Sequence, residues 1–140
     1  DILEENPVPA KYYLSTCYMD TLIRHKERHA AKGHGFGYEI RDLDDVSGAI
    51  VCGGMGRERN LIIDKRQTNL TPTTHIKGEI NKDGIRKMTP REWARLQGFP
   101  DDYKFVLADV HLYKQFGNSV TVPVIQAIAE KIKEVLDKND

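Results

Sequence analysis

Histidine and cysteine are the side chains of this chain best suited to metal binding or nucleophilic catalysis, and their spacing favours neither. His25 and His29 lie one helical turn apart, but Glu27 stands third in the His-Lys-Glu-Arg-His stretch, where the zinc-protease pattern requires it second. Cys17 and Cys52 have no basic partner placed by the sequence to activate a thiolate. We therefore expect no metal site and no catalytic residue, and we expect both cysteines in the core.

Glycine-rich stretches and basic clusters are the features that could suit a phosphate-bearing partner. Residues 33–37 are Gly-His-Gly-Phe-Gly, but they follow a predicted helix rather than a strand and do not match a phosphate-binding fingerprint. Basic residues gather at 24–32, 57–66 and 82–95, although the whole chain has 21 Lys and Arg against 21 Asp and Glu. Such clusters can bind a phosphate backbone locally, although charge clusters are usually only solvated surface.

The elements that would position these residues begin with one helix and three short strands. Ser15 is a good N-cap, and a stretch without glycine or proline continues from it to Gly33, which predicts a helix with a basic, solvated second half. Short β-type runs among glycines predict strands at residues 38–41, 49–52 and 61–63. This region is irregular and short of core residues, so it needs support from other segments.

Clearer helix signals lie in the second half of the chain. Thr89 and Glu92 form a capping-box pattern with proline at the first helical position, and Gly98 marks the end of the helix predicted at residues 90–97. A further helix is predicted to begin near Pro123. Its apolar stripe, with the spacing of a face packed on a core, comprises Val124, Ile125, Ile128, Ile132, Val135 and Leu136.

Composition limits the class of protein. Hydrophobic residues make up 39% of the 140 positions and there are 11 glycines, which is typical of a globular domain. Two cysteines form no disulfide framework, no signal sequence opens the chain, and no apolar run is long enough to span a membrane. The chain starts at Asp1 without Met. We therefore expect a fragment of a soluble, cytoplasmic protein, with no membrane partner.

Two long motifs resemble those of a known family. Residues 89–101 are Thr-Pro-Arg-Glu-Trp-Ala-Arg-Leu-Gln-Gly-Phe-Pro-Asp, and residues 115–124 are Gln-Phe-Gly-Asn-Ser-Val-Thr-Val-Pro-Val. They resemble the ninth and tenth motifs, the last two, of the bacterial DNA cytosine-5 methyltransferases. Residues 1–4 and 11–15 also resemble the segment after the eighth motif, so the resemblance covers essentially the whole chain, with residues 33–84 similar only in texture.

The resemblance implies an α+β fold: a small, irregular, β-rich DNA-recognition lobe with flanking helices. Its C-terminal helix would pack on a Rossmann-like, S-adenosylmethionine-dependent methyltransferase domain that this sequence lacks. The implied parts are a connecting segment and helix at 1–32, a variable target-recognition region at 33–84, a structural helix of the lobe at 85–101, and a return segment with the C-terminal helix at 102–140.

The resemblance also implies roles for individual residues. Asn118, Ser119 and Val120 match the residues of the last motif beside the S-adenosylmethionine pocket. Phe36, with glycine on both sides, resembles a loop residue that in some relatives enters the duplex where the target cytosine has left it. The alternative role for Phe36 is that of a core residue of the lobe.

Four further residues are candidates for DNA contacts. Gly53 and Gly54 belong to a glycine loop, and Arg57 and Arg59 follow it closely. Because the arginine fork matches the two acceptors of guanine, these arginines are candidates for reading guanines, and phosphate contacts are the alternative.

The residues of the family's chemistry are missing. Its reaction uses a cysteine in a Pro-Cys motif and a glutamate in a Glu-Asn-Val motif, and neither motif occurs in this sequence. The chain is therefore expected to be inactive alone, as the C-terminal portion of a cytosine-5 methyltransferase of a restriction-modification system. Its expected partners are double-stranded DNA and an N-terminal catalytic part or separate catalytic subunit. The alternatives are a non-catalytic DNA-binding module, and a protein-interaction domain that docks through the helix after Pro123.

Overall fold

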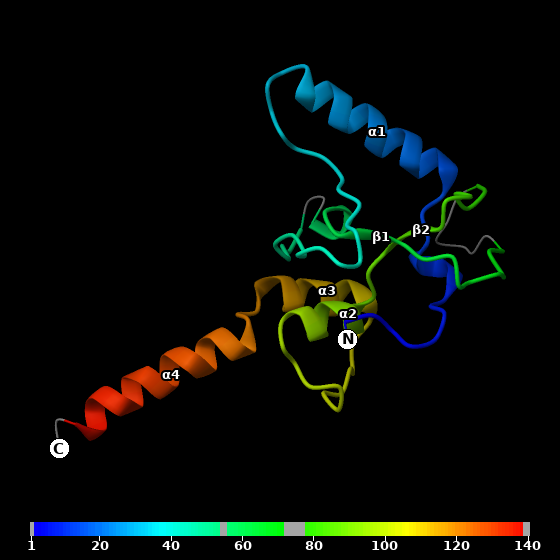
Figure 1. The fold of residues 1–140 in the computed structure, drawn as a ribbon. Helices are drawn as coiled ribbons and strands as arrows, with labels where there is room; N and C mark the ends of the chain where they lie inside the picture. The colour runs from blue at the N-terminus through cyan, green and yellow to red at the C-terminus, as the bar shows by residue number, and fades with distance from the viewer. Residues whose placement is uncertain (1, 54–55, 72–77, 139–140) are drawn as a thin grey trace.

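The computed structural model describes residues 2–53, 56–71 and 78–138, which form a small α+β unit with helices around a two-stranded sheet (Figure 1). The structure thus agrees with the expected fold class in its general form. The elements in chain order are the 3-10 turn η1 (Ala10–Tyr12), α1 (Thr16–Ala30), the 3-10 turn η2 (Gly56–Glu58), β1 (Leu61–Ile63), β2 (Ile85–Lys87), α2 (Pro90–Leu96), α3 (Asp109–Asn118) and α4 (Val122–Asp137).

The sheet joins segments that are far apart in the sequence. β1 and β2 are antiparallel, with Leu61 opposite Lys87. Single bridges add Tyr13 beside Arg86 and Ile40 beside Leu61. The predicted strand at residues 61–63 is confirmed, whereas its partner β2 was not predicted.

The other two predicted strands are wrong. Residues 38–41 contribute only the bridge at Ile40. Residues 49–52 form no strand because they pack against helices instead. Ile50 packs against the core around α2 and α3, and the backbone of Cys52 lies against Gly117 of α3. No strand among the described residues pairs with this segment.

α1 agrees with its prediction in position and in exposure. Ser15 caps the helix by accepting a hydrogen bond from the Tyr18 amide at 3.1 Å, and Met19 and Leu22 are buried beneath it. The basic second half is largely exposed. The expectation that Cys17 is a core thiol is wrong, because it lies on the exposed face of α1, and Cys52 is only half-buried.

α2 has the predicted capping box and is the centre of the main core. Thr89 Oγ1 accepts from the Glu92 amide at 3.1 Å, and Glu92 Oε2 accepts from the Thr89 amide at 2.7 Å. Trp93 is 1% exposed and meets Tyr113 of α3 edge to face, with ring centroids 4.9 Å apart. α3 was not predicted from the sequence, yet it covers α2 and completes this core.

A buried ionic network connects β2 to α2. Arg86 Nη1 and Nη2 donate to the two carboxylate oxygens of Glu92, each at 2.8 Å, and both side chains are 0% exposed. Arg86 Nε donates to Asp64 Oδ2 at 2.9 Å. Hydrogen bonds from Arg66, with those from Arg86, hold the pKa of Asp64 well below its usual range. Every charge of the network therefore has an opposite charge in contact, which buried ions require.

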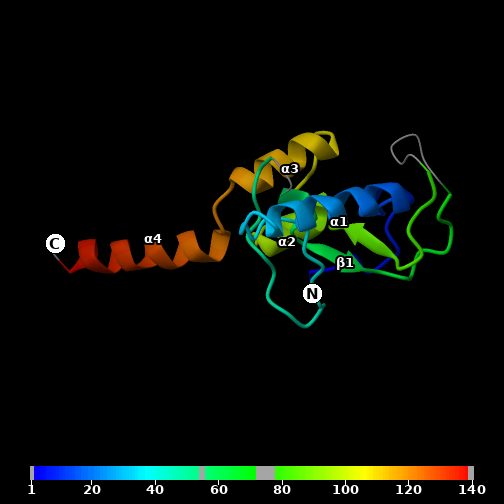
Figure 2. The ribbon, with the colours of Figure 1, turned by 90° about the horizontal axis from the view of Figure 1, so that it is seen from above.

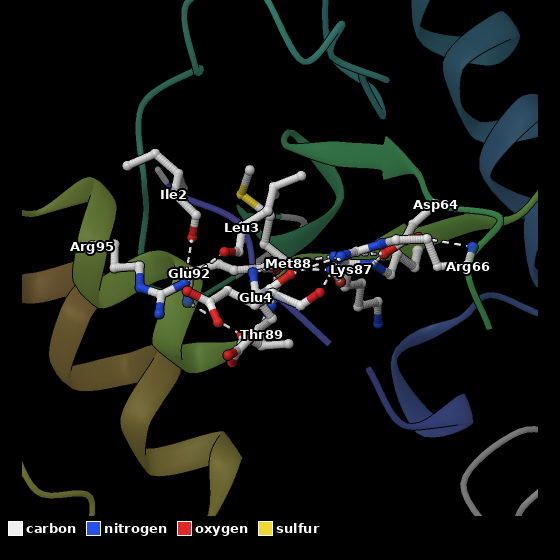
Figure 3. Close-up of polar contacts among 12 residues, drawn as sticks. Ile2, Leu3, Glu4, Asp64, Arg66, Lys87, Met88, Thr89, Glu92 and Arg95 are labelled. Atoms are coloured by element: carbon white, nitrogen blue, oxygen red, sulfur yellow. Dashed lines mark hydrogen bonds and ion pairs between the residues drawn. The ribbon is translucent and has the colours of Figure 1, made fainter. Parts of the chain in front are cut away.

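The same network fixes the start of the chain against α2, as Figure 3 shows. Glu4 donates its backbone N–H to Glu92 Oε1 at 3.1 Å. Arg95 Nη1 donates to the carbonyls of Leu3 at 2.6 Å and Ile2 at 3.2 Å. Residues 2–4 are thus held by α2, the helix of the first motif, at residues 89–101.

α4 leaves the rest of the molecule and projects away from it (Figures 1 and 2). Every residue from Val122 to Asp137 is exposed. Its stripe of large aliphatic side chains lines a shallow apolar groove along the helix. The helix and its stripe are as predicted, but the stripe packs on none of the hydrophobic cores formed by the described residues.

Candidate functional site

Three of the residues predicted to contact DNA converge on one open hollow of about 390 Å³. Phe36, Gly53 and Arg59 line it, together with His25 and His29 from α1. Phe36 is 55% exposed, so its alternative as a core residue is wrong. Gly53 has a φ of +96°, a left-handed conformation that glycine adopts without strain. Gly54 lies outside the described residues.

Aromatic rings form a continuous wall on the α1 side of this hollow. The rings of His25 and His29 are 4.4 Å apart at their centroids, and Phe36 meets His29 edge to face at 6.0 Å. His34 lies 6.1 Å from His29 and 6.0 Å from Phe36. In the described part of the chain, the Nδ1 atoms of His25 and His29 are buried and have no hydrogen-bond partner.

The charge around His29 is positive. Partial burial, followed by the charges of His25, His34, Lys32 and Arg28, lowers the pKa of His29 below its ordinary value. An anion beside these rings would reverse that effect. The histidines that appeared as metal candidates in the sequence thus face the predicted DNA-binding residues, a proximity that the sequence did not reveal.

Arg57 points away from this hollow, toward α3. Its guanidinium carbon lies 5.5 Å from the centroid of the Tyr113 ring, a cation–π distance. It lines a second hollow of about 520 Å³ with Lys11 and Lys87. Lys11 pairs with Asp109 at 2.6 Å and Lys87 with Glu58 at 3.1 Å, so their charges are already matched. The structure therefore separates the two arginines that the sequence grouped together.

The predicted cofactor residues lie where α3 ends and the turn to α4 begins: Asn118 is the last residue of α3, and Ser119 and Val120 follow it. Asn118 and Val120 are exposed, and Ser119 is half-buried with its hydroxyl donating to the Phe116 carbonyl at 2.9 Å. Gly117, directly before the turn, lies against the recognition region: an added Cβ would be 2.6 Å from the Cys52 nitrogen. The end of α3, directly before the turn, is therefore in contact with the segment that leads to Gly53.

Other site types have no support in the described residues. In residues 2–53, 56–71 and 78–138, no three His, Cys, Asp or Glu side chains are grouped to hold a metal ion. Over the same residues, no helix has the length and apolar character needed to cross a membrane.

Comparison with known proteins identifies the family. The model of the C-5 cytosine-specific DNA methylases matches residues 1–134 of this chain. The chain belongs to this family. It is 68% identical over 136 residues to the type II methyltransferase M.HpaII of Haemophilus parainfluenzae, covering 97% of this chain and 38% of that protein. It is 40% identical over 138 residues to M.SsoII of Shigella sonnei, covering 98% and 32%.

Solved structures show a related fold at low sequence identity. Dnmt2 methyltransferase of S. pombe superposes with a TM-score of 0.68 at 19% identity, covering 98% of this chain and 42% of that one. The Entamoeba histolytica methyltransferase EhMeth gives 0.63 at 19% identity, covering 96% and 40%. This cytosine methylase chain thus spans about two fifths or less of the length of each of these relatives.

Proposed function

We propose that this chain is the C-terminal portion of a bacterial DNA cytosine-5 methyltransferase of a restriction-modification system. In this role it recognises a specific DNA sequence and completes the S-adenosylmethionine pocket for methyl transfer to C5 of a flipped cytosine. The observation that supports this most strongly is the family match over residues 1–134, which includes both terminal motifs. The catalytic cysteine and glutamate belong to the N-terminal part, so the chain alone is inactive.

The hollow around Phe36 is the proposed DNA-binding surface. An exposed aromatic ring, a glycine loop and Arg59 offer stacking, close backbone approach and positive charge in one place. His25 and His29 add imidazole N–H groups that can donate to phosphate oxygens. Partial burial is the main cause of the lowered pKa of His29, and the neighbouring positive charges that add to it also favour the approach of DNA, a polyanion. Arg57, held over Tyr113, is proposed as a second contact with the same duplex.

The turn at residues 118–120 suits the edge of a cofactor pocket. The Ser119 carbonyl accepts a hydrogen bond from the side chain of Gln97, directly after α2, while Asn118 and Val120 leave an amide and an aliphatic side chain exposed. An amide and an aliphatic surface match the polar and apolar parts of S-adenosylmethionine, which supplies the methyl group when bound. This chain contributes one edge of the pocket, and the rest lies in the N-terminal part.

The apolar stripe of α4 is proposed to pack on the N-terminal catalytic part. Val124, Ile128 and Ile132 are each 50% exposed or more, although aliphatic side chains of this size are usually buried. A contiguous exposed apolar face marks a surface that another protein segment covers. The relatives have more than half of their length outside the matched region, which provides such a segment.

Reconstitution tests this function. The N-terminal part encoded upstream is produced separately and mixed with this chain, or joined to it as the complete protein, and methyl transfer from labelled S-adenosylmethionine to plasmid DNA is measured. We expect activity only when both parts are present. A folded, associated mixture without methyl transfer would contradict the proposal, and salt-independent DNA binding by the complete protein would contradict the phosphate contacts.

A further inference from the structure

Gln97, the residue that ends α2, holds the turn between α3 and α4. It is 7% exposed. Its side-chain Nε2 donates to the Phe116 carbonyl at 2.9 Å and to the Ser119 carbonyl at 3.4 Å. Thr121 Oγ1 donates to its Oε1 at 2.8 Å. One buried amide thus binds the backbone before the turn, the turn itself, and the side chain after it.

Neighbouring backbone contacts strengthen this junction. The Val122 amide donates to the Gln97 carbonyl at 2.8 Å. Gly98 has a φ of +77° and lies so close to Pro123 that an added Cβ would be 2.4 Å from the proline Cδ. The end of α2 and the start of α4 are therefore in direct contact, and the turn cannot move far without α2.

The recognition region contacts the turn from another segment. The backbone of Cys52 packs against Gly117, directly before Asn118, and Cys52 directly precedes Gly53 in the proposed DNA-binding hollow. The turn is therefore placed between the structural helix of the lobe and the loop that faces DNA. At both contacts the segments are closely packed, with no room for an added side-chain carbon.

The geometry points to Gln97 as a positioning residue for S-adenosylmethionine: it sets the place of Asn118, Ser119 and Val120 relative to the DNA-recognition lobe. This inference rests on the proposed function, because it concerns the same cofactor turn. Gln97 is buried beneath the turn, whereas Asn118 and Val120 are exposed on it. Its loss would leave the groups proposed to contact the cofactor chemically unchanged but poorly placed. The effect should therefore appear in cofactor binding before it appears in DNA binding.

Gln97→Leu in the complete protein tests this, because leucine keeps the approximate size and removes every side-chain hydrogen bond. We expect the KM for S-adenosylmethionine to rise about tenfold, with a smaller change in kcat and little change in the Kd for DNA. Thr121→Val removes only the hydroxyl bond to Gln97 and should raise this KM by a smaller factor. Thr121→Ser keeps the donor and should have a KM close to that of the wild type.

Asn81→Leu is the matched control. Asn81 is 5% exposed, and its amide donates to the carbonyls of Leu14 at 2.7 Å and Ile85 at 2.8 Å, so its loss loosens the lobe without touching the turn. An equal rise in cofactor KM for Asn81→Leu and Gln97→Leu would overturn the inference, since general loosening would explain both.

Asn118→Ala separates the inference from the function on which it rests. If Asn118→Ala raises the cofactor KM and Gln97→Leu does not, the positioning role is wrong and the proposed function stands. If the wild-type protein neither binds S-adenosylmethionine nor transfers methyl groups, the proposed function fails and the inference fails with it.

Discussion

Replacing Arg86 by methionine should strongly destabilise the fold. Arg86 makes two 2.8 Å bonds to Glu92 and one 2.9 Å bond to Asp64, all in the interior. Asp64 would keep its contact with Arg66 at 2.8 Å, but Glu92 would remain buried with only backbone donors. Removing one partner of a buried ion pair costs about 3–5 kcal/mol, because the remaining charge is uncompensated. We expect a loss of this size in the free energy of unfolding.

The assay is urea unfolding followed by the fluorescence of Trp93, the single tryptophan, which is 1% exposed and lies next to Glu92 on α2. The double variant Arg86→Met/Glu92→Gln removes the uncompensated charge and should recover part of the loss, which a double-mutant cycle measures as coupling. Lys131→Met is the control, because its pair with Glu134 at 2.9 Å is exposed and should contribute little. Equal midpoints for Arg86→Met and Lys131→Met, or purely additive effects in the cycle, would refute the reasoning.

Three further outcomes are expected in the complete protein. Arg57→Ala or Arg59→Ala should reduce discrimination between cognate and altered DNA sites by about 1–3 kcal/mol where the side chain recognises a base, measured by fluorescence anisotropy; equal weakening on every duplex would assign a phosphate contact. DNA affinity should fall as pH rises through the histidine range. The fall should be about tenfold if a phosphate raises the lowered pKa of His29 by one unit. The double variant His25→Gln/His29→Gln should abolish this dependence of affinity on pH at constant ionic strength. An unchanged slope would exclude the imidazoles. Ile128→Asp should weaken association between the two separate parts at least about tenfold by calorimetry, while an unchanged Kd would show that α4 docks elsewhere.

The helices were the most predictable part of the fold because their signals are local. Ser15 and Thr89 are caps whose side chains bond within the next turn, and the structure shows both bonds. α3 escaped prediction because Ala108, the residue at its N-cap position, has no side chain that can cap a helix. β2 escaped prediction because it is three residues long and has a buried arginine, Arg86, at its centre. The ion pairs of Arg86 with Asp64 and Glu92 explain why a charged residue is buried there.

The candidate site was predictable in its residue types but not in its arrangement. Phe36, Gly53 and Arg59 were each suggested by local features, yet nothing in their spacing shows that they share a hollow. His29 was assessed as a metal ligand because histidines one turn apart suggest it, and only the structure places it against Phe36. Arg57 and Arg59 are two residues apart in the sequence but line different hollows. The chain turns at η2, so their side chains point in different directions.

Exchange of residues 33–84 addresses the recognition role without relying on any single side chain. In the complete protein, this segment is replaced by the matching region of a relative that methylates a different DNA sequence, and the methylated positions are mapped by bisulfite sequencing. The helices α2 and α3, the turn at 118–120 and the N-terminal part remain those of this protein. We predict that 5-methylcytosine appears at the relative's sequence. Methylation that stays at the original sequence would contradict a recognition role for this chain.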